Sequence, residues 1–177
     1  MRWSLRPRHA ALIEAAKTWA QRDDRVRALV LRGSLGRGEG DELSDVDLVI
    51  VAEPGRWDEL WRSRRAVAER FGRVLGLFRE LASADPTLAI AIYDGPLKVD
   101  LFFHEGALRE SRRDAEGVTV PFRRDGAVPP PSRREPSRAP LQAPSGFDEH
   151  HADLDEFDAH AWDFALWLWT KLQRAET

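Results

Sequence analysis

The stretch Gly33-Ser-Leu-Gly-Arg-Gly38, followed by Ser44-Asp-Val-Asp-Leu-Val-Ile50, carries most of the information in this chain about fold and chemistry. An apolar run at residues 28–31 ends in a glycine–serine turn, and a second apolar run begins around Asp45 and Asp47. Side chains at positions i and i+2 of a strand point to the same face, so the two carboxylates should project together. Two hard oxygen ligands beside a glycine-rich loop indicate a Mg²⁺ ion that holds a nucleoside triphosphate.

A third aspartate, Asp100, lies within a later apolar run at residues 97–103. Aspartates in an apolar strand cost free energy unless they are paired or bind a metal ion. Asp45 can also be explained as the end of a loop, but this does not explain Asp47, whose neighbours are valine, leucine and isoleucine. If the two strands are neighbours, three carboxylates converge. They would hold two Mg²⁺ ions, one with the triphosphate and one beside the attacking hydroxyl group.

Three residues of the glycine-rich stretch are candidate contacts of the triphosphate. A glycine after a strand is commonly a turn that needs a positive φ angle, and Gly33 would also leave room for a phosphate group. Ser34 can be the N-cap of a short helix or a hydrogen-bond donor to a phosphate oxygen, and the two roles are compatible. Arg37 can be a surface side chain or a clamp on the β- and γ-phosphates. The sequence has no Walker A motif, dinucleotide fingerprint or kinase signature.

Composition excludes several other classes of function. The chain of 177 residues has no cysteine, which rules out disulfides, thiol catalysis and cysteine-ligated metals. A formal net charge of −3 gives no general argument for binding nucleic acid. No apolar run is long enough to span a membrane, and the basic N-terminus lacks the apolar core of a signal peptide. The expected location is therefore the cytoplasm.

The spacing of apolar residues predicts an α+β fold. Helices are expected at residues 9–21 and 57–71, and strands at residues 26–31, 46–51, 88–93 and 97–103. The last two strands flank Asp94-Gly95-Pro96, which indicates a hairpin. The chain is predicted to divide into a domain at 1–113 that carries the motifs, a proline- and arginine-rich linker or arm at 114–147, and an acidic, tryptophan-rich C-terminal helix within 148–177.

The C-terminal helix, expected at residues 153–174, has bulky apolar side chains on several of its faces. They are Trp162, Phe164, Leu166, Trp167, Leu168 and Trp169. One face of a single domain cannot cover them all, and an exposed patch of this kind usually marks an interface. We therefore expect the helix to pack against a second copy of the chain or a partner protein. The alternative is that the arm covers it.

The combined motifs resemble the polymerase-β-like nucleotidyltransferase superfamily. The resemblance rests on Gly33-Ser34, ten intervening residues, Asp45-x-Asp47 and the later strand aspartate, and it covers roughly residues 8–105. It implies a mixed, largely antiparallel sheet with helices on one face, and transfer of a nucleoside monophosphate to a hydroxyl group. By resemblance, Asp45, Asp47 and Asp100 are the expected catalytic metal ligands. Gly33 and Ser34 are the expected contacts of the triphosphate, and Asp100 is also a candidate general base.

The fuller string through Leu48 looks like the antibiotic and minimal branches of this superfamily, which leaves the acceptor open. The acidic and aromatic C-terminal region is similar to the helical part of aminoglycoside- and lincosamide-type adenylyltransferases. It favours ATP as donor, a small hydroxylated acceptor and a role in antibiotic resistance. The short chain favours a hydroxyl group of a partner protein, as in minimal nucleotidyltransferases that modify a toxin. The third alternative is a non-catalytic binding module of the same fold.

Overall fold

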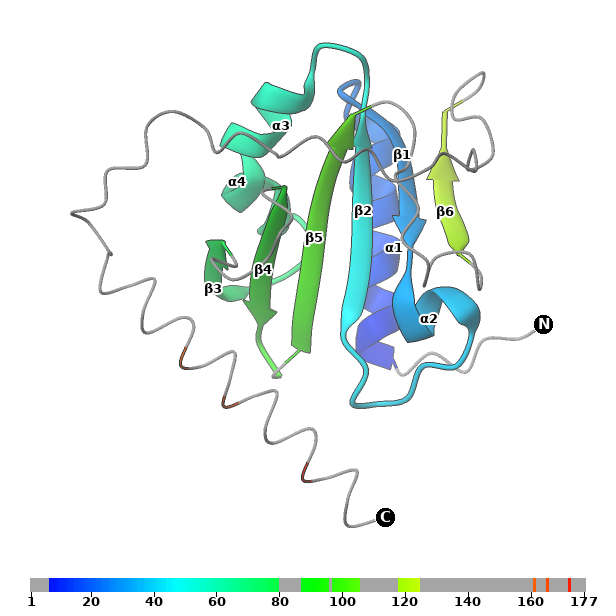
Figure 1. Ribbon diagram of the computed structural model, residues 1–177, viewed down its shortest axis with the longest axis vertical. Coiled ribbons are helices and arrows are strands. Elements are labelled where there is room, and N and C mark those ends of the chain that lie inside the picture. Colours follow the sequence, from blue (N-terminus) through cyan, green and yellow to red (C-terminus); the bar gives the residue numbers. More distant parts are fainter. Residues whose placement is uncertain are drawn as a thin grey trace, which may run out of the picture.

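The computed structural model describes residues 7–79, 87–95, 97–105 and 118–124, together with Ala161, Ala165 and Leu172. Within these residues, six strands form one sheet, which Figure 1 shows face on. The strands are β1 (Val26–Leu31), β2 (Val46–Ala52), β3 (Val74–Arg79), β4 (Leu88–Tyr93), β5 (Leu97–Glu105) and β6 (Thr119–Arg123). The helices are α1 (Pro7–Arg22), α2 (Gly33–Arg37), α3 (Trp57–Arg62) and α4 (Arg64–Ala68).

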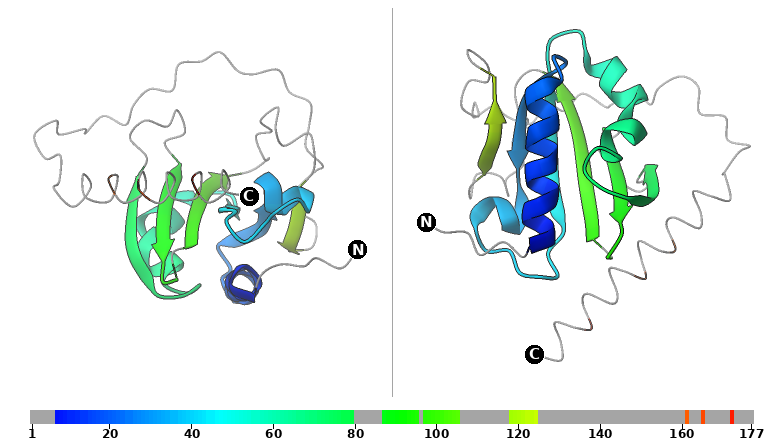
Figure 2. Two further views of the ribbon diagram at one scale, coloured as in Figure 1. Left: turned by 90° about the horizontal axis from the view of Figure 1, so that it is seen from below. Right: turned by 180° about the vertical axis from the view of Figure 1, so that it is seen from behind.

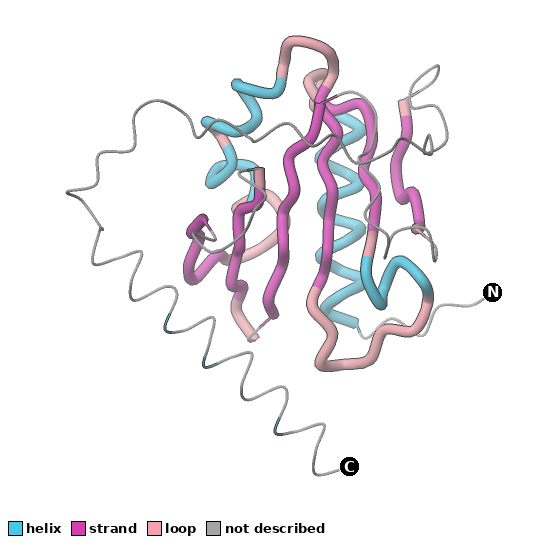
Figure 3. The backbone as a smooth tube through the Cα atoms, viewed as in Figure 1, coloured by secondary structure: helices cyan, strands magenta, loops and turns pink. Residues whose placement is uncertain are grey.

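The order of the strands in the sheet is β3-β4-β5-β2-β1-β6 (Figure 3, strands in magenta). β2 and β5 pair in parallel at the centre, and the other neighbouring strands pair antiparallel. The predicted hairpin is present, because Tyr93 of β4 pairs with Leu97 of β5. This mixed, mostly antiparallel sheet with its helices confirms the predicted α+β fold class.

The main core lies between the sheet and helices α1, α3 and α4, which cover one face (Figure 2). Along β5, the side chains of Leu97, Val99, Leu101 and Phe103 are buried in this core. The alternation of a strand therefore directs Lys98, Asp100, Phe102 and His104 to the opposite face, which we call the second face. Asp47 alternates in the same way with Val46 and Leu48, which belong to the core. The aspartates of interest thus lie away from the covering helices.

The predicted helix at 57–71 is wrong in its continuity and its end. It is divided at Ser63 into α3 and α4, and it ends at Ala68. The Ser63 hydroxyl donates hydrogen bonds to the carbonyl oxygens of Glu59 at 2.8 Å and Leu60 at 3.2 Å. A serine that bonds back to the preceding turn competes with the regular helical pattern and bends the helix.

Two strands, β3 and β6, were not expected from the sequence. β6 lies within the stretch assigned to the proline- and arginine-rich arm, and it contains Pro121. It pairs only with β1, at the edge of the described sheet, and its register shifts between the partners of Leu29 and Leu31. An edge strand tolerates a proline because the missing N–H is not needed by a second neighbour. The predicted boundaries at residues 113 and 147 lie outside the described residues.

Little of the predicted C-terminal helix falls within the described residues. Ala161, Ala165 and Leu172 are helical and exposed. The rest of residues 148–177, with its expected interface, lies outside the described part of the chain. Among the described residues, no helix combines the length and the apolar character that a membrane span requires.

Candidate functional site

The three predicted aspartates lie close together at the start of β2 and along β5. β2 and β5 lie side by side in the sheet (Figure 1), and Asp47 and Asp100 are direct partners in their parallel pairing. Asp45 immediately precedes β2, and its carboxylate is more exposed than that of Asp100, at 39% against 16%. The pairing of two strands far apart in the sequence therefore brings all three carboxylates to one region of the second face.

The ammonium group of Lys98 lies between two of these carboxylates. Its Nζ is 3.0 Å from Asp100 Oδ1 and 3.2 Å from Asp100 Oδ2, to which it donates a hydrogen bond. The same Nζ is 3.6 Å from Asp45 Oδ2. The Lys98 side chain is only 14% exposed, so most of its surface is enclosed by the site.

Asp100 is the most unusual carboxylate of the site. It lies between Ile90 of β4 and Asp47 of β2, and burial raises its pKa to about 6. The ammonium of Lys98 opposes this increase, whereas the negative charges of Asp47 and Asp45 add to it. Asp100 Oδ1 is buried and accepts no hydrogen bond, although Lys98 Nζ lies nearby. The site therefore holds a carboxylate oxygen that lacks a full set of partners.

Gly33 provides the space that the Asp47 carboxylate occupies. Its φ angle is +62°, as expected for a turn that requires glycine. A Cβ atom at this position would overlap Asp47 Oδ2. The backbone also joins these two places, because Arg32 N donates to the carbonyl oxygen of Asp47 at 2.9 Å. Gly33 is therefore required for the position of a candidate ligand, in addition to any contact with phosphate.

Ser34 and Arg37 lie in the short helix α2 that follows this turn. Of the two candidate roles of Ser34, the N-cap is wrong, because Arg32 occupies that position and its carbonyl oxygen accepts the helical hydrogen bond from Gly36 N at 2.8 Å. Arg37 Nε donates to Glu39 Oε2 at 2.8 Å. Glu39 is 66% exposed, so this pair is of the weak, solvent-screened kind.

Residues 12–105 match a family model described as a nucleotidyltransferase domain. The chain belongs to the nucleotidyltransferase family. The match covers more than half of the chain, extends from α1 to the end of β5, and includes every site residue predicted above. The match confirms the superfamily that the motifs resemble. It supports nucleotidyl transfer as the general reaction of this protein. No curated protein matches the sequence.

The carboxylates of this nucleotidyltransferase fit a divalent metal ion by the chemistry of their oxygens. Mg²⁺ prefers carboxylate oxygen ligands, and Asp100 Oδ1 is a buried acceptor without a hydrogen bond. As the side chains stand, no three histidine, cysteine or acidic residues in the described part of the chain form a ready metal cluster. The ammonium group of Lys98 lies near both Asp45 and Asp100, 3.6 Å from an oxygen of the first and 3.0 Å from an oxygen of the second.

The loop before Asp45 is held by contacts that the sequence did not reveal. His9 of α1 is fully buried, and its Nε2 donates to the carbonyl oxygen of Ser44 at 2.9 Å. The Ser44 hydroxyl donates to Asp41 Oδ1 at 2.8 Å, and Asp41 N donates back to Ser44 Oγ at 2.9 Å. These contacts fix the backbone immediately before a candidate ligand. A buried histidine near the start of an amphipathic helix was the available signal, but nothing local identified its partner.

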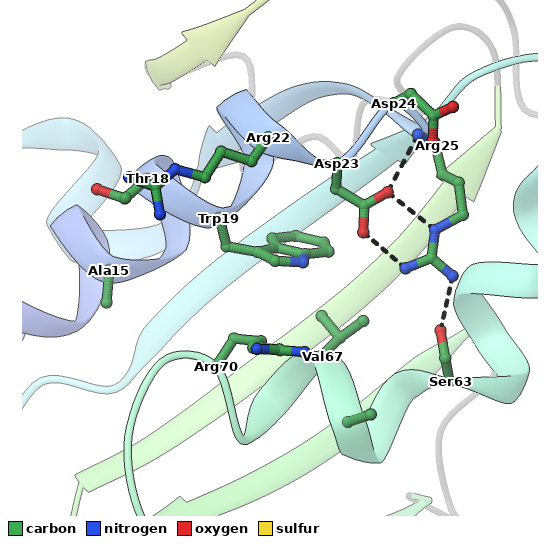
Figure 4. A pocket seen from close by; sticks show the side chains of 11 residues that line it. Ala15, Thr18, Trp19, Arg22, Asp23, Asp24, Arg25, Ser63, Val67 and Arg70 are labelled. Atoms are coloured by element: carbon green, nitrogen blue, oxygen red, sulfur yellow. Dashed lines mark hydrogen bonds and ion pairs between the residues drawn. The ribbon is translucent and has the colours of Figure 1, made fainter.

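A cavity of about 610 Å³ lies elsewhere, between α1 and the segment at residues 63–70 that contains α4 (Figure 4). Trp19, Arg25 and Ser63 are among the residues that line it, and none of the predicted site residues does so. Arg25 directly precedes β1, whereas Gly33 follows the other end of that strand. The cavity and the carboxylates are therefore at opposite ends of β1, and the cavity is not the nucleotide site proposed below.

Proposed function

We propose that this nucleotidyltransferase transfers AMP from ATP to a hydroxyl group of a small molecule, such as an aminoglycoside-like antibiotic, in a Mg²⁺-dependent reaction. The observation that carries the proposal is the convergence of Asp45, Asp47 and Asp100 beside the Gly33 turn. Three carboxylates held together on apolar strands are costly unless they bind cations. The family match supplies the general reaction, and the carboxylates supply a reason for its dependence on a divalent metal.

Asp45, Asp47 and Asp100 would hold two Mg²⁺ ions, and Gly33, Ser34 and Arg37 would contact the triphosphate. When bound, the metal supplies positive charge that stabilises the entering and leaving oxygens of the displacement. Gly33 keeps the carboxylate of Asp47 close to the backbone of the turn. Arg37 can exchange its exposed partner Glu39 for a phosphate oxygen, since that ion pair is solvent-screened.

Asp100 is suited to move the proton of the reaction. The acceptor oxygen attacks the α-phosphorus, its new P–O bond forms as the bond to pyrophosphate breaks, and its proton passes to the Asp100 carboxylate. A general base works best when its pKa is near the working pH. In the metal-free protein, burial raises the pKa of Asp100 to about 6, which makes this carboxylate more basic than an ordinary aspartate.

The nature of the acceptor follows from charge in the sequence. The segment that precedes the tryptophan-rich stretch contains Asp148, Glu149, Asp153, Asp155, Glu156 and Asp158. Such a concentration of negative charge raises the local concentration of cationic molecules. An antibiotic with several amino and hydroxyl groups would be attracted by this negative charge, and it would offer a hydroxyl group as the acceptor.

The test uses ATP labelled at the α-phosphorus, with Mg²⁺, a panel of antibiotics and, separately, a cell lysate. The wild-type protein should label an antibiotic, and Asp47→Asn should reduce the rate on the order of a hundredfold or more, because the amide keeps the shape but loses the charge. Asp24→Asn is the matched control, because Asp24 is 85% exposed and outside the site.

Other outcomes contradict parts of this proposal. Label that appears only on a protein of the lysate would replace the small acceptor with a partner protein. Calorimetry that detects no Mg²⁺-dependent binding of ATP to the wild-type protein would contradict catalysis altogether and leave a non-catalytic binding module.

A further inference from the structure

Lys98 differs from an ordinary surface lysine in its burial and in its partners. It lies two residues before Asp100 on the same face of β5, and its ammonium group contacts both Asp100 and Asp45. Lys17, the other described lysine, pairs with the 67%-exposed Glu14 on the surface of α1. The chain has lysine only at positions 17, 98 and 171, among 27 basic residues. A compact ammonium is therefore placed at the one described region where three aspartates meet.

A divalent ion and this ammonium group would compete for the same oxygen atoms. Lys98 Nζ lies within 3.0–3.6 Å of oxygens of two candidate metal ligands. Two cations that share carboxylates at such distances repel each other, and the repulsion is strongest where water is largely excluded. Although Asp100 Oδ1 is 3.0 Å from Lys98 Nζ, it accepts no hydrogen bond, so a metal ion would give this oxygen a ligand bond that Lys98 does not replace.

We propose that Lys98 is an internal counter-cation, which a divalent metal ion must displace from Asp45 and Asp100 before it can bind. This inference rests on the proposed function, since it concerns the same metal site. In the metal-free protein, Lys98 holds the carboxylates together against their mutual repulsion. The displaced ammonium needs a new anionic partner, and a nucleoside triphosphate supplies one. Lys98 thus makes the site discriminate against free metal ions and favour a metal ion that arrives with a triphosphate.

The decisive measurement is the affinity for Mn²⁺ without nucleotide, by calorimetry, in wild-type protein and in Lys98→Met. Methionine is similar in length and has no charge. The variant should bind Mn²⁺ about tenfold more tightly than wild type, because the competing cation is gone. Lys17→Met is the matched control and should leave the affinity unchanged. Damage to the structure would weaken metal binding, so an increase cannot come from misfolding.

A second measurement covers the case in which Lys98→Met does not fold. With lysines only at positions 17, 98 and 171, protein with ¹³C-labelled lysine gives few side-chain NMR signals. Addition of Mn²⁺ broadens signals near the ion and Mg²⁺ shifts them, so the Lys98 signal of the wild-type protein should respond and the Lys17 signal should not. Assignment follows from the two methionine variants or from Lys98→Arg.

The outcomes separate this inference from the proposed function. If wild-type protein binds Mn²⁺, and folded Lys98→Met binds it equally or more weakly, the role of Lys98 is wrong and the metal site stands. A Lys98 signal that stays unchanged while the metal binds has the same meaning. If neither protein binds Mn²⁺, with or without ATP, the metal site itself is absent and both proposals fall.

Discussion

Two clusters of charged side chains, at opposite ends of β1, are almost equally buried but differ in how completely they are satisfied. At the cavity end, Arg25 donates to Asp23 from Nε at 2.8 Å and from Nη2 at 2.6 Å, with side-chain exposures of 22% and 12% (Figure 4). At the other end, Lys98 and Asp100 are 14% and 16% exposed, yet Asp100 Oδ1 accepts no hydrogen bond. Burial alone therefore does not distinguish the two clusters.

The pKa values of the two aspartates shift in opposite directions for this reason. The hydrogen bonds from Arg25 hold the pKa of Asp23 below its ordinary value, whereas burial raises the pKa of Asp100 to about 6. A complete bidentate pair gains stability from its own partners and has little to offer a ligand. The Lys98–Asp100 pair is incomplete, so the Asp100 carboxylate would gain more binding free energy from a bound metal ion. The difference favours a structural role for the Asp23 cluster and supports our proposal that the Asp100 cluster is a binding site.

Of the changes that test this contrast between the two clusters, Gly33→Ala should have the largest effect, on the rate of nucleotidyl transfer. The new Cβ would overlap the Asp47 carboxylate and would also be strained at a positive φ, so nucleotidyl transfer should fall on the order of a hundredfold. Gly55→Ala is the matched control, because Gly55 has a φ of +77° but no atom within 4 Å of its Cβ position. Similar transfer rates in the two variants would contradict the role of Gly33 in placing Asp47.

A smaller effect, on stability alone, is expected at the other end of β1 for Asp23→Asn. The amide cannot accept both guanidinium hydrogen bonds as an anion does, so the free energy of unfolding should fall by about 1–3 kcal/mol. Urea denaturation measures this change, and the rate of nucleotidyl transfer should remain that of wild type. A loss of transfer in the folded variant would show that the two clusters are not independent.

The smallest effect is a difference in pH dependence, measured in metal-free buffer. Asp100 has a raised pKa, so the folded protein binds this proton more tightly than the unfolded chain, and wild type should gain stability relative to Asp100→Asn as the pH falls from 7 to 5. Asp23 has a lowered pKa, so its contribution is present above its ordinary pKa of 3.8 and is lost as the pH falls through the lower value in the folded protein.

Urea denaturation at several pH values would measure both slopes. A gain on the order of 1 kcal/mol between pH 7 and pH 5 is expected for Asp100, because one pKa unit corresponds to about 1.4 kcal/mol. Parallel slopes for Asp23→Asn and Asp100→Asn, each taken relative to wild type, would contradict the contrast between the two clusters.

The sequence predicted the parts of the fold that have strong local patterns. β1, β2 and β4 have nearly continuous apolar runs, β5 alternates apolar with other residues, and α1 has a clear apolar stripe. β3 was missed because its side chains are mostly half-buried and it contains a glycine, so no alternation stands out. β6 was missed because it contains Pro121. A proline lacks the backbone N–H that an interior strand needs, so it argues against a strand unless the strand is known to lie at an edge.

For the candidate site, residue types could be predicted but contacts could not. Asp45, Asp47 and Asp100 were singled out because carboxylates in apolar runs need a physical reason. Their convergence depended on whether β2 and β5 are neighbours, which no local pattern decides. The role of Lys98 and the bond from His9 to Ser44 both depend on the tertiary fold, and neither was foreseen.

The position of Lys98 on the same strand as Asp100 has a consequence for how the chain assembles. β2 is synthesised before β5, so Asp45 and Asp47 are present before the strand that pairs with β2 has been made. A strand that carried only Asp100 would bring a third negative charge towards two others. Because Lys98 is two residues away on the same side, the part of β5 that meets Asp45 and Asp47 carries no net charge. The same pair of residues thereby lowers the electrostatic barrier to the long-range parallel pairing at the centre of the sheet.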